Sequence, residues 1–438
     1  MTTPYETNAA GHLTVGGVEA NELAARFGTP LYAYDVSAMR QQMRDFKRVF
    51  TERQVDYAVS YASKAFATVA MYEVAAQEGM HIDVVSGGEI YTALEANFPM
   101  SDVSFNGNNK SEEELVMAIE NNLGTIIVDN FFELHLLHDL LAERDRVQNI
   151  LLRITPGVEA HTHDYISTGQ TDSKFGFDVN SGQAQAALQE ALADPHFNVL
   201  GVHAHIGSQI FDVTGFQMAA TKLVDLVHEW GFNPKVINTG GGFGIRYTED
   251  DEPIPASDFV AAIIDTIAEK TTEYGMPMPA VWIEPGRSIV GPAGVSLYTI
   301  GSRKDVPGIR SYLAVDGGMG DNIRPALYQA KYEAVLVNQP EAPAEEVVRV
   351  AGKYCESGDV LVWEQALPKT KAGDVLAVLA TGAYGYSMAS NYNRNPRPAV
   401  VFVENGEAKV VVERESYQDI VRLDATTYRK KEETAWQN

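Results

Sequence analysis

The sequence predicts an α/β protein, in which a (β/α)8 barrel of the TIM type is followed by an all-β domain, either a sandwich or a small barrel. Strand-like runs alternate with helical patterns over about 230 residues, close to the roughly 250 that such a barrel takes. Past Gly291, short runs rich in Val, Leu and Tyr are separated by Gly, Pro and Asn turns, which is typical of β structure. The same alternation would also suit a doubly wound open sheet, and counting strands does not separate the two.

Composition limits the kinds of partner. The chain has 438 residues, so two domains are expected. It carries 34 basic and 59 acidic residues, and its net charge of −25 disfavours nucleic acid and anionic membrane surfaces as partners. No apolar run approaches a membrane span, and the N-terminus lacks the layout of a secretory signal. A single cysteine, Cys355, excludes an intrachain disulfide framework, and we expect a cytoplasmic protein.

The predicted barrel elements follow in order along the chain. A helix at 21–27, a strand at 31–34 and a helix at 37–50 precede it. The barrel strands are expected at 55–61, 82–86, 103–106, 125–129, 150–155, 200–206, 236–239 and 281–284. Helical patterns between them cover 67–78, 133–144, 183–193, 214–230 and 259–274, and another opens at Ser111, where Glu114 completes capping-box spacing.

The second domain is predicted from short β-rich runs. They lie at 295–300, 312–315, 347–351, 360–362, 375–379 and 400–403. The acidic segment 339–346 is expected to be an exposed loop. We therefore expect residues 30–290 to form the barrel, and residues 1–29 with 291–438 to form the β-rich domain.

Lys64 stands where the first predicted barrel strand ends. Val55, Tyr57, Val59 and Tyr61 alternate with smaller or polar residues, the period of a half-buried strand, and a helical pattern follows the lysine. In parallel α/β folds this end of a strand carries the chemistry, because the βα loops converge there. An amine so placed can form a Schiff base with a carbonyl if its pKa is lowered. Taken alone, an ordinary surface lysine is the commoner explanation.

Two further motifs end the seventh and eighth strands. The glycines Gly240 to Gly242 leave backbone N–H groups accessible and permit positive φ angles, as an anion nest requires. Loops after strands seven and eight are the usual phosphate site of a barrel. Glu284-Pro-Gly-Arg287 could form a structural ion pair. Alternatively, Glu284 pairs with a protonated ring nitrogen and Arg287 with a phosphate or carboxylate.

Paired histidines raise a metal site as an alternative. His203 and His205, two residues apart on a predicted strand, would point to one face, and His161 with His163 forms a second pair. Metal-dependent hydrolase barrels present ligands in this way, but the carboxylates expected beside a metal are not obvious here. An imidazole stacked on a flat cofactor ring explains one histidine equally well, with Ser208 donating to a phosphate.

The second domain also contains candidate catalytic and substrate-binding residues. They lie in the segments 324–328, 352–359 and 381–388. A lone cysteine is more often an inert buried residue. Cys355, however, stands among polar residues in a Gly-bounded loop, which suits a reactive thiol better than a core residue.

Together these motifs resemble the alanine-racemase-like, group IV pyridoxal-phosphate decarboxylases, and within them the family that acts on diaminopimelate. The resemblance spans nearly the whole chain. Its most telling segments are 61–65, 205–209, 240–242, 284–287, 324–328, 355–358 and 390–397. It implies pyridoxal 5'-phosphate as cofactor, no metal, and decarboxylation of meso-2,6-diaminopimelate to L-lysine and CO2.

The resemblance also implies residue roles. Lys64 would hold the cofactor as a Schiff base, and Cys355 would protonate the substrate carbon. The cofactor would further be contacted by Asp83, His205, Ser208, Gly240, Gly241, Gly242, Glu284, Gly286, Arg287 and Tyr384. His205 would stack on the ring, Ser208 and the glycines would bind the phosphate, and Glu284 would pair with the ring nitrogen. The far end of the substrate would be held by Arg287, Arg324, Tyr328, Glu356 and Tyr384.

In the family that the chain resembles, the cysteine loop comes from the second subunit, so a homodimer with shared active sites is expected. Decarboxylases of ornithine, arginine or lysine share the fold, but their substrates lack the second carboxylate that two arginines would hold. A metal-dependent hydrolase, an alanine racemase and a catalytically silent binding homologue are further alternatives. The silent homologue would usually lack Lys64 or Cys355, and both are present.

Overall fold

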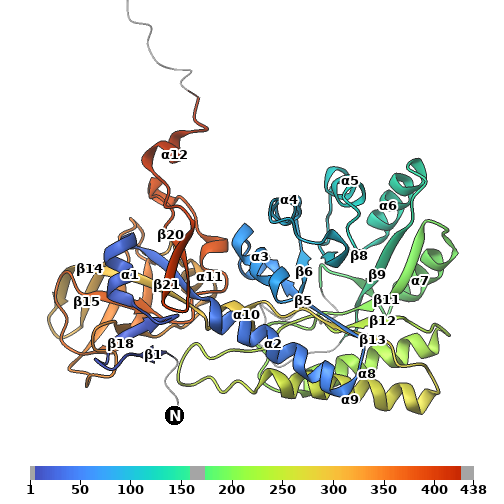
Figure 1. Ribbon diagram of the computed structural model, residues 1–438, viewed down its shortest axis with the longest axis horizontal. Coiled ribbons are helices and arrows are strands. Elements are labelled where there is room, and N and C mark those ends of the chain that lie inside the picture. Colours follow the sequence, from blue (N-terminus) through green and yellow to red (C-terminus); the bar gives the residue numbers. More distant parts are fainter. Residues whose placement is uncertain (1–4, 158–172, 426–438) are drawn as a thin grey trace, which may run out of the picture.

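Parallel strands close into a barrel among the residues that the computed structural model describes, 5–157 and 173–425 (Figure 1). β5 (Tyr57–Ala62) pairs with β6 (His81–Val84) on one side and with β13 (Ala280–Ile283) on the other. The ring continues through β7 (Val103–Phe105), β8 (Thr125–Val128), β9 (Gln148–Thr155), β11 (Phe197–His203) and β12 (Val236–Asn238). Because β8 also pairs with β9, the ring has no free edge, and the eight predicted strands form the barrel rather than an open sheet.

The barrel strands are buried on both faces. In β8, Ile126 and Val128 pack in the large core that includes the surrounding helices. Ile127, between them, packs instead with Leu151 and Val236 in a separate cluster drawn from β8, β9 and β12. This alternation places one face of each strand against the helices and the other in the barrel interior, which is a packed core.

Most of the outer helices lie where the sequence predicts them. They are α3 (Val69–Gln77), α5 (Glu112–Glu120), α6 (Phe131–Glu143), α7 (Gln183–Ala193), α8 (Thr214–Glu229) and α9 (Ala256–Tyr274). Ser111 and Glu114 form the expected capping box of α5. α4 (Gly87–Glu95) was not predicted, because it begins with two glycines, which disfavour a helix. Ser86 starts this helix by accepting a hydrogen bond from the N–H of Glu89 (3.3 Å).

α2 (Val36–Arg53) closes the outer layer although it precedes the first barrel strand. After β13 the chain forms only the short α10 (Arg287–Val290) and then enters β14 (Gly294–Val306) of the second domain. α2 packs against α9 and α10, and so occupies the place that a helix after β13 would otherwise take (Figure 1).

The second domain is a mixed sheet in the order β18-β17-β15-β14-β4-β20-β21, with β19 also paired to β14 and to β16. The strands β15 (Arg310–Val315), β17 (Glu346–Ala351), β18 (Val360–Leu367), β19 (Val375–Val378) and β20 (Ala399–Glu404) match the predicted runs. β16 (Ala334–Leu336), β21 (Glu407–Val412) and the small sheet β1 (Glu6–Thr7), β2 (Leu13–Val15) and β3 (Val18–Glu19) were not predicted. The predicted N-terminal helix is α1 (Ala20–Phe27), and residues 339–345 form the expected loop.

One boundary needs correction. β4 (Leu31–Asp35), which the predicted division at residue 30 assigns to the barrel, pairs antiparallel with β14 and parallel with β20. It therefore belongs to the second sheet, and the barrel begins with α2. The four residues 31–34 are all buried, so their pattern alone suited either sheet. In the described residues, no helix is both long and apolar enough to cross a membrane.

Candidate active site

Lys64 lies at the centre of a single 3-10 turn (Ser63–Ala65) between β5 and α3. The turn is fixed from both domains. The hydroxyl of Tyr61 donates to the carbonyl of Phe66 (2.7 Å), and the N–H of Tyr384, from the β domain, donates to the carbonyl of Ala65 (2.8 Å). The Lys64 side chain itself is exposed and lines a small cavity at the carboxyl end of the barrel strands. The predicted strand-end position of the lysine is therefore correct.

The cavity gathers most of the predicted cofactor-binding residues. They come from the loops after four barrel strands and from the second domain: Lys64, His205, Ser208, Gly242, Glu284, Gly286, Arg287 and Tyr384. Asp83, Gly240 and Gly241 do not line it. Asp83 is buried near Glu284, and the two glycines lie directly beside the lining residues His205 and Glu284.

The glycine loop is pressed between two strand ends. Gly240 and Gly242 have φ angles of +71° and +112°, which side chains rarely adopt. A Cβ on Gly241 would lie 2.1 Å from the carbonyl oxygen of Glu284, and one on Gly242 would lie 2.3 Å from that of Gly207. The three glycines are thus required sterically, and they leave a side-chain-free floor beside Ser208 and Arg287.

His205 is held as a neutral imidazole. Its Nδ1 accepts a hydrogen bond from the N–H of Gly241 (3.2 Å). Burial, together with the cations of Lys64 and Arg153, lowers the pKa of His205 well below its usual value. A neutral, flat ring facing the cavity suits contact with a planar aromatic group.

A carboxylate network lies beneath the cavity. Glu284 accepts hydrogen bonds from His203 Nε2 (3.0 Å) and Asn238 Nδ2 (2.8 Å). Asn106 Nδ2 lies 3.4 Å from Glu284 and donates to Asp83 at 2.6 Å. Burial acts to raise the pKa of both acids. For Glu284 the interactions with His203, together with smaller contributions from His205 and Lys64, outweigh burial and lower the pKa, whereas the neighbouring Glu284 raises the pKa of Asp83 further. Glu284 is therefore ionised, whereas burial and the charge of Glu284 favour the protonated form of Asp83.

The strand that carries the histidine pair is shorter than predicted. β11 ends at His203, so His205 lies beyond the strand, and the two side chains have different partners, Glu284 and Gly241. The predicted strand, which ran to residue 206, therefore ends three residues early. His161 and His163 lie outside the described residues.

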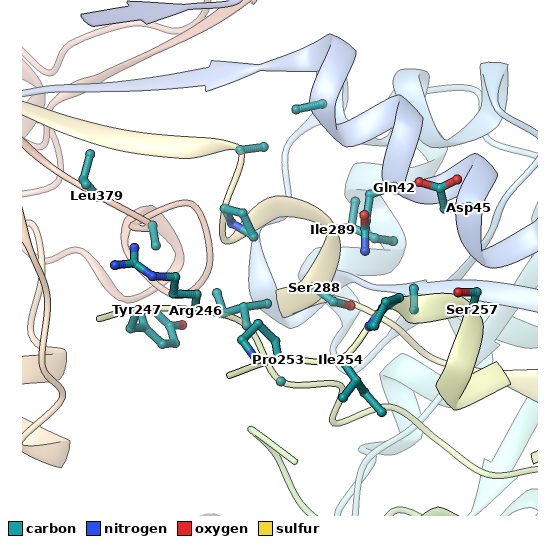
Figure 2. Close-up of a pocket in the computed structure, with 18 of the residues that line it drawn as sticks. Gln42, Asp45, Arg246, Tyr247, Pro253, Ile254, Ser257, Ser288, Ile289 and Leu379 are labelled. Carbon is teal, nitrogen blue, oxygen red and sulfur yellow. The ribbon is translucent and has the colours of Figure 1, made fainter. Parts of the chain in front are cut away.

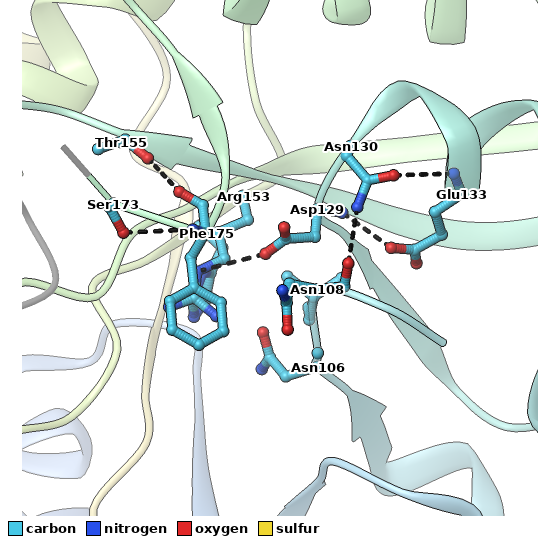
Figure 3. Close-up of polar contacts among 12 residues, drawn as sticks. Asn106, Asn108, Asp129, Asn130, Glu133, Arg153, Thr155, Ser173 and Phe175 are labelled. Atoms are coloured by element: carbon cyan, nitrogen blue, oxygen red, sulfur yellow. Dashed lines mark hydrogen bonds and ion pairs between the residues drawn. The ribbon is translucent and has the colours of Figure 1, made fainter. Parts of the chain in front are cut away.

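Arg153, which was not predicted as a site residue, lies near the end of β9, beside Asp129 and Phe175 (Figure 3). It stacks over the ring of Phe175 (4.2 Å), and its Nε lies 3.8 Å from Asp129 Oδ1. The N–H of Asp129 donates in turn to Glu133 (3.1 Å). Burial lowers the pKa of Arg153, while the charges of Asp129, Glu284 and Asp83 act against that. Its charge is one of those that balance the buried acids beneath the cavity.

The two predicted substrate arginines converge from different domains. Arg287, on α10, and Arg324, on α11 (Arg324–Tyr328), both donate to the hydroxyl of Tyr247, at 2.5 and 3.0 Å. Their guanidinium carbons lie 4.8 and 5.8 Å from the ring centre of Tyr384. Tyr328, at the end of α11, is 44% exposed. Sequence reasoning missed Tyr247, and its only signal was an aromatic residue shortly after the glycine loop.

Cys355 and Glu356 are exposed and do not line the Lys64 cavity of their own chain. Their loop is nevertheless anchored. The N–H of Cys355 donates to Asn393 Oδ1 (2.8 Å), and the N–H of Tyr354 donates to the buried Asp359 (2.8 Å). This anchored loop presents the thiol and carboxylate outward.

The residues around Lys64 fit a flat, anionic carbonyl cofactor. A primary amine, an ionised carboxylate and a neutral imidazole surround the cavity, and the glycine floor, Ser208 and Arg287 offer donors to a phosphate. Arg287 Nε and Ser288 Oγ are buried and have no hydrogen-bond partner in the described part of the chain. Fold and site together define a pyridoxal-phosphate-dependent barrel enzyme.

Comparisons with known proteins agree. The pyridoxal-binding domain of the pyridoxal-dependent decarboxylases matches residues 36–291. Diaminopimelate decarboxylase of Bacillus methanolicus is 60% identical over 93% of this chain and 96% of its own length, and that of Bacillus subtilis (strain 168) is 58% identical over 95% and 96%. The crystal structure of diaminopimelate decarboxylase from M. jannaschii in complex with L-lysine has a TM-score of 0.89 at 38% identity and covers 96% of this chain and 97% of that one. The chain belongs to the diaminopimelate decarboxylase family.

Proposed function

We propose that this protein decarboxylates meso-2,6-diaminopimelate to L-lysine and CO2, the last step of bacterial lysine biosynthesis. The observation that carries the proposal is the pair Arg287 and Arg324, which converge beside the Lys64 cavity. Two guanidinium groups suit a second carboxylate at the far end of the substrate. Ornithine, arginine and lysine lack that carboxylate. A lysine/ornithine decarboxylase from Vibrio vulnificus shares the fold at 22% identity.

The cofactor roles follow from the site. Lys64 would hold pyridoxal phosphate covalently, His205 would lie against its ring, and Glu284 would pair with the ring nitrogen. Asp83 would act from behind Glu284, through Asn106. The remaining contacts to the cofactor would come from Ser208, Gly240, Gly241, Gly242, Gly286, Arg287 and Tyr384. When bound, this cofactor supplies an electron sink for the carbon that loses CO2.

The substrate roles concern both ends of the molecule. Arg287, Arg324 and Tyr328 would bind the distal carboxylate, and Glu356 would bind the distal ammonium group. These contacts orient the substrate so that the reacting carboxylate leaves from a fixed direction. Cys355 Sγ would then deliver a proton to the carbon from which CO2 departed.

We also propose a cytoplasmic homodimer in which the loop carrying Cys355 and Glu356 completes the site of the partner subunit. Both residues face outward within one chain. Tyr392, which stacks on Tyr354 next to Cys355, is 42% exposed, and Tyr417 and Val421 of the C-terminal α12 (Tyr417–Val421) are also exposed. Exposed apolar groups beside an anchored polar loop support a contact with a second copy of the chain.

The deciding experiment is a visible absorption spectrum of the purified protein, followed by CO2 release from meso-diaminopimelate, L-lysine and L-ornithine. We expect a yellow protein that releases CO2 from meso-diaminopimelate alone and forms L-lysine. Faster release from L-lysine or L-ornithine would move the assignment to another basic amino acid. A protein that stays colourless with added pyridoxal phosphate would contradict the cofactor assignment.

Glu284→Gln should lower kcat by about 100-fold or more, the scale for removing one preorganised charge at a reacting centre. A neutral amide can still accept from Asn238, but it cannot stabilise a protonated ring nitrogen. Steady-state kinetics and the cofactor content of the purified variant test this. A variant that keeps its cofactor and turns over within threefold of the wild type would instead make Glu284 only a structural partner of His203.

A further inference from the structure

Tyr247 connects the two arginines of the site. Its side chain is 7% exposed, and its hydroxyl oxygen accepts from Arg287 Nη1 (2.5 Å) and from Arg324 Nη1 (3.0 Å). Tyr332 packs edge-on against the Tyr247 ring with 5.2 Å between ring centres, and its hydroxyl also accepts from Arg324 Nη1 (2.5 Å). Arg287 and Arg324 therefore share one phenol oxygen, although they come from different domains.

Two like charges brought together repel each other, and the effect is larger in a buried site than in water. An oxygen placed between the two guanidinium groups offsets that repulsion and fixes their spacing. Burial alone would raise the pKa of Tyr247, but the cations of Arg287 and Arg324 outweigh it and hold that pKa below its ordinary value.

The contacts of Arg287 leave a donor for a ligand. Its Nη2 donates to Ser208 Oγ (2.8 Å), which also lines the Lys64 cavity. Its Nε is buried and has no hydrogen-bond partner within the described residues. With Nη1 on Tyr247 and Nη2 on Ser208, the guanidinium plane is fixed at two points while a third donor stays available.

We propose that Tyr247 is a positioning residue that determines selectivity for a second carboxylate, because it holds Arg287 and Arg324 at the spacing in which both reach the same anionic group. This inference rests on the proposed function, which assigns the arginine pair to the distal end of the substrate. Tyr332 supports Arg324 in the same arrangement. Tyr247 itself acts through the arginines.

The surroundings of Tyr247 decide which substitution is informative. Tyr247 also lines a second cavity of about 500 Å3, between α2, α10 and the loop before α9, together with Gln42, Ile254 and Ser288 (Figure 2). Truncation to alanine would remove the wall between this cavity and the arginines. Tyr247→Phe keeps the ring and removes only the shared oxygen.

The experiment compares two ligands that differ by the distal carboxylate. Decarboxylation of one end of diaminopimelate leaves L-lysine, whose carboxylate is the distal one, whereas cadaverine keeps both amines and has no carboxylate. Calorimetry on the cofactor-loaded protein should show that Tyr247→Phe lowers the affinity for L-lysine about tenfold or more. That is the scale for losing a hydrogen bond to a charged group. Cadaverine affinity should stay within twofold. In kinetics, KM for meso-diaminopimelate should rise more than kcat falls.

Tyr298→Phe is the matched control, because Tyr298 is buried in the same core cluster as Tyr247 and bonds neither arginine. It should leave both affinities unchanged. If Tyr247→Phe fails to fold, Tyr332→Phe replaces it as the test variant. It should lower the affinity for L-lysine but not for cadaverine, because it removes an acceptor from Arg324 alone.

Unchanged L-lysine affinity in a folded variant would overturn the inference. An equal loss of affinity for L-lysine and for cadaverine would also overturn it, because it would mark a merely structural role. Failure of the proposed function has a different signature. In that case the wild type would release no CO2 from meso-diaminopimelate and would bind L-lysine no better than cadaverine.

Discussion

Lys64→Ala should lower the rate of CO2 release from meso-diaminopimelate by a factor on the order of 10⁴ or more. That is the scale for removing a side chain that forms a covalent bond to a reacting group. Among the described residues, Lys64 is the only lysine that lines the cavity formed by His205, Glu284 and Arg287, so no other lysine there can take its place. The visible absorption of the purified protein should disappear with the activity. Stopped CO2 release and the absorption spectrum together test the assignment.

Lys64→Arg separates bond formation from charge. A guanidinium keeps the positive charge near Glu284 and His205, two groups whose pKa values respond to Lys64, but it does not form a Schiff base at neutral pH. We therefore expect Lys64→Arg to be as inactive as Lys64→Ala, with thermal stability close to that of the wild type because Lys64 is exposed. Full turnover by either variant would remove Lys64 from the mechanism.

The barrel could be predicted because its strands are buried on both faces and alternate regularly with helices. β8 contains the apolar run Ile126 to Val128 and β9 the run Ile150 to Leu152, and such runs are typical of a parallel sheet that is covered on both faces. Ring closure could not be predicted, because it depends on the pairing of β13 with β5, strands more than 200 residues apart. The position of β4 in the second sheet could not be predicted for the same reason, because its partners β14 and β20 are distant in sequence.

Some residues of the site could be predicted from the sequence, and others could not. Lys64, the glycine loop and Glu284 could be predicted from local sequence, because each ends a strand and the carboxyl ends of parallel strands meet. Tyr247 and Arg153 could not, because their roles come only from partners supplied by other elements: Arg324 of the β domain for Tyr247, and Asp129 and Phe175 for Arg153. Sequence patterns describe faces of helices and strands, whereas these contacts form between them.

Cys355→Ala should lower turnover of meso-diaminopimelate by about 10² to 10⁴-fold, the range for losing a positioned proton donor. The cofactor spectrum should be unchanged, because Cys355 is exposed and does not line the Lys64 cavity of its own chain. Loss of the spectrum would show that the thiol supports the structure of the site rather than the proton transfer. Cys355→Ser, which keeps a weaker hydroxyl donor of similar size, should fall between the alanine variant and the wild type.

The outward position of Cys355 makes a sharper test possible. If the thiol serves the partner subunit, then Lys64→Ala subunits, which are inactive alone, and Cys355→Ala subunits, which are nearly so, should recover activity when they are unfolded together and refolded as mixed dimers. A two-fold dimer of random composition contains one intact site in half of its molecules, so roughly a quarter of wild-type activity should return. Each variant refolded by itself is the control. Recovery would place Lys64 and Cys355 of one working site on different chains, whereas mixtures no more active than the separate variants would place both on one chain and contradict the shared site.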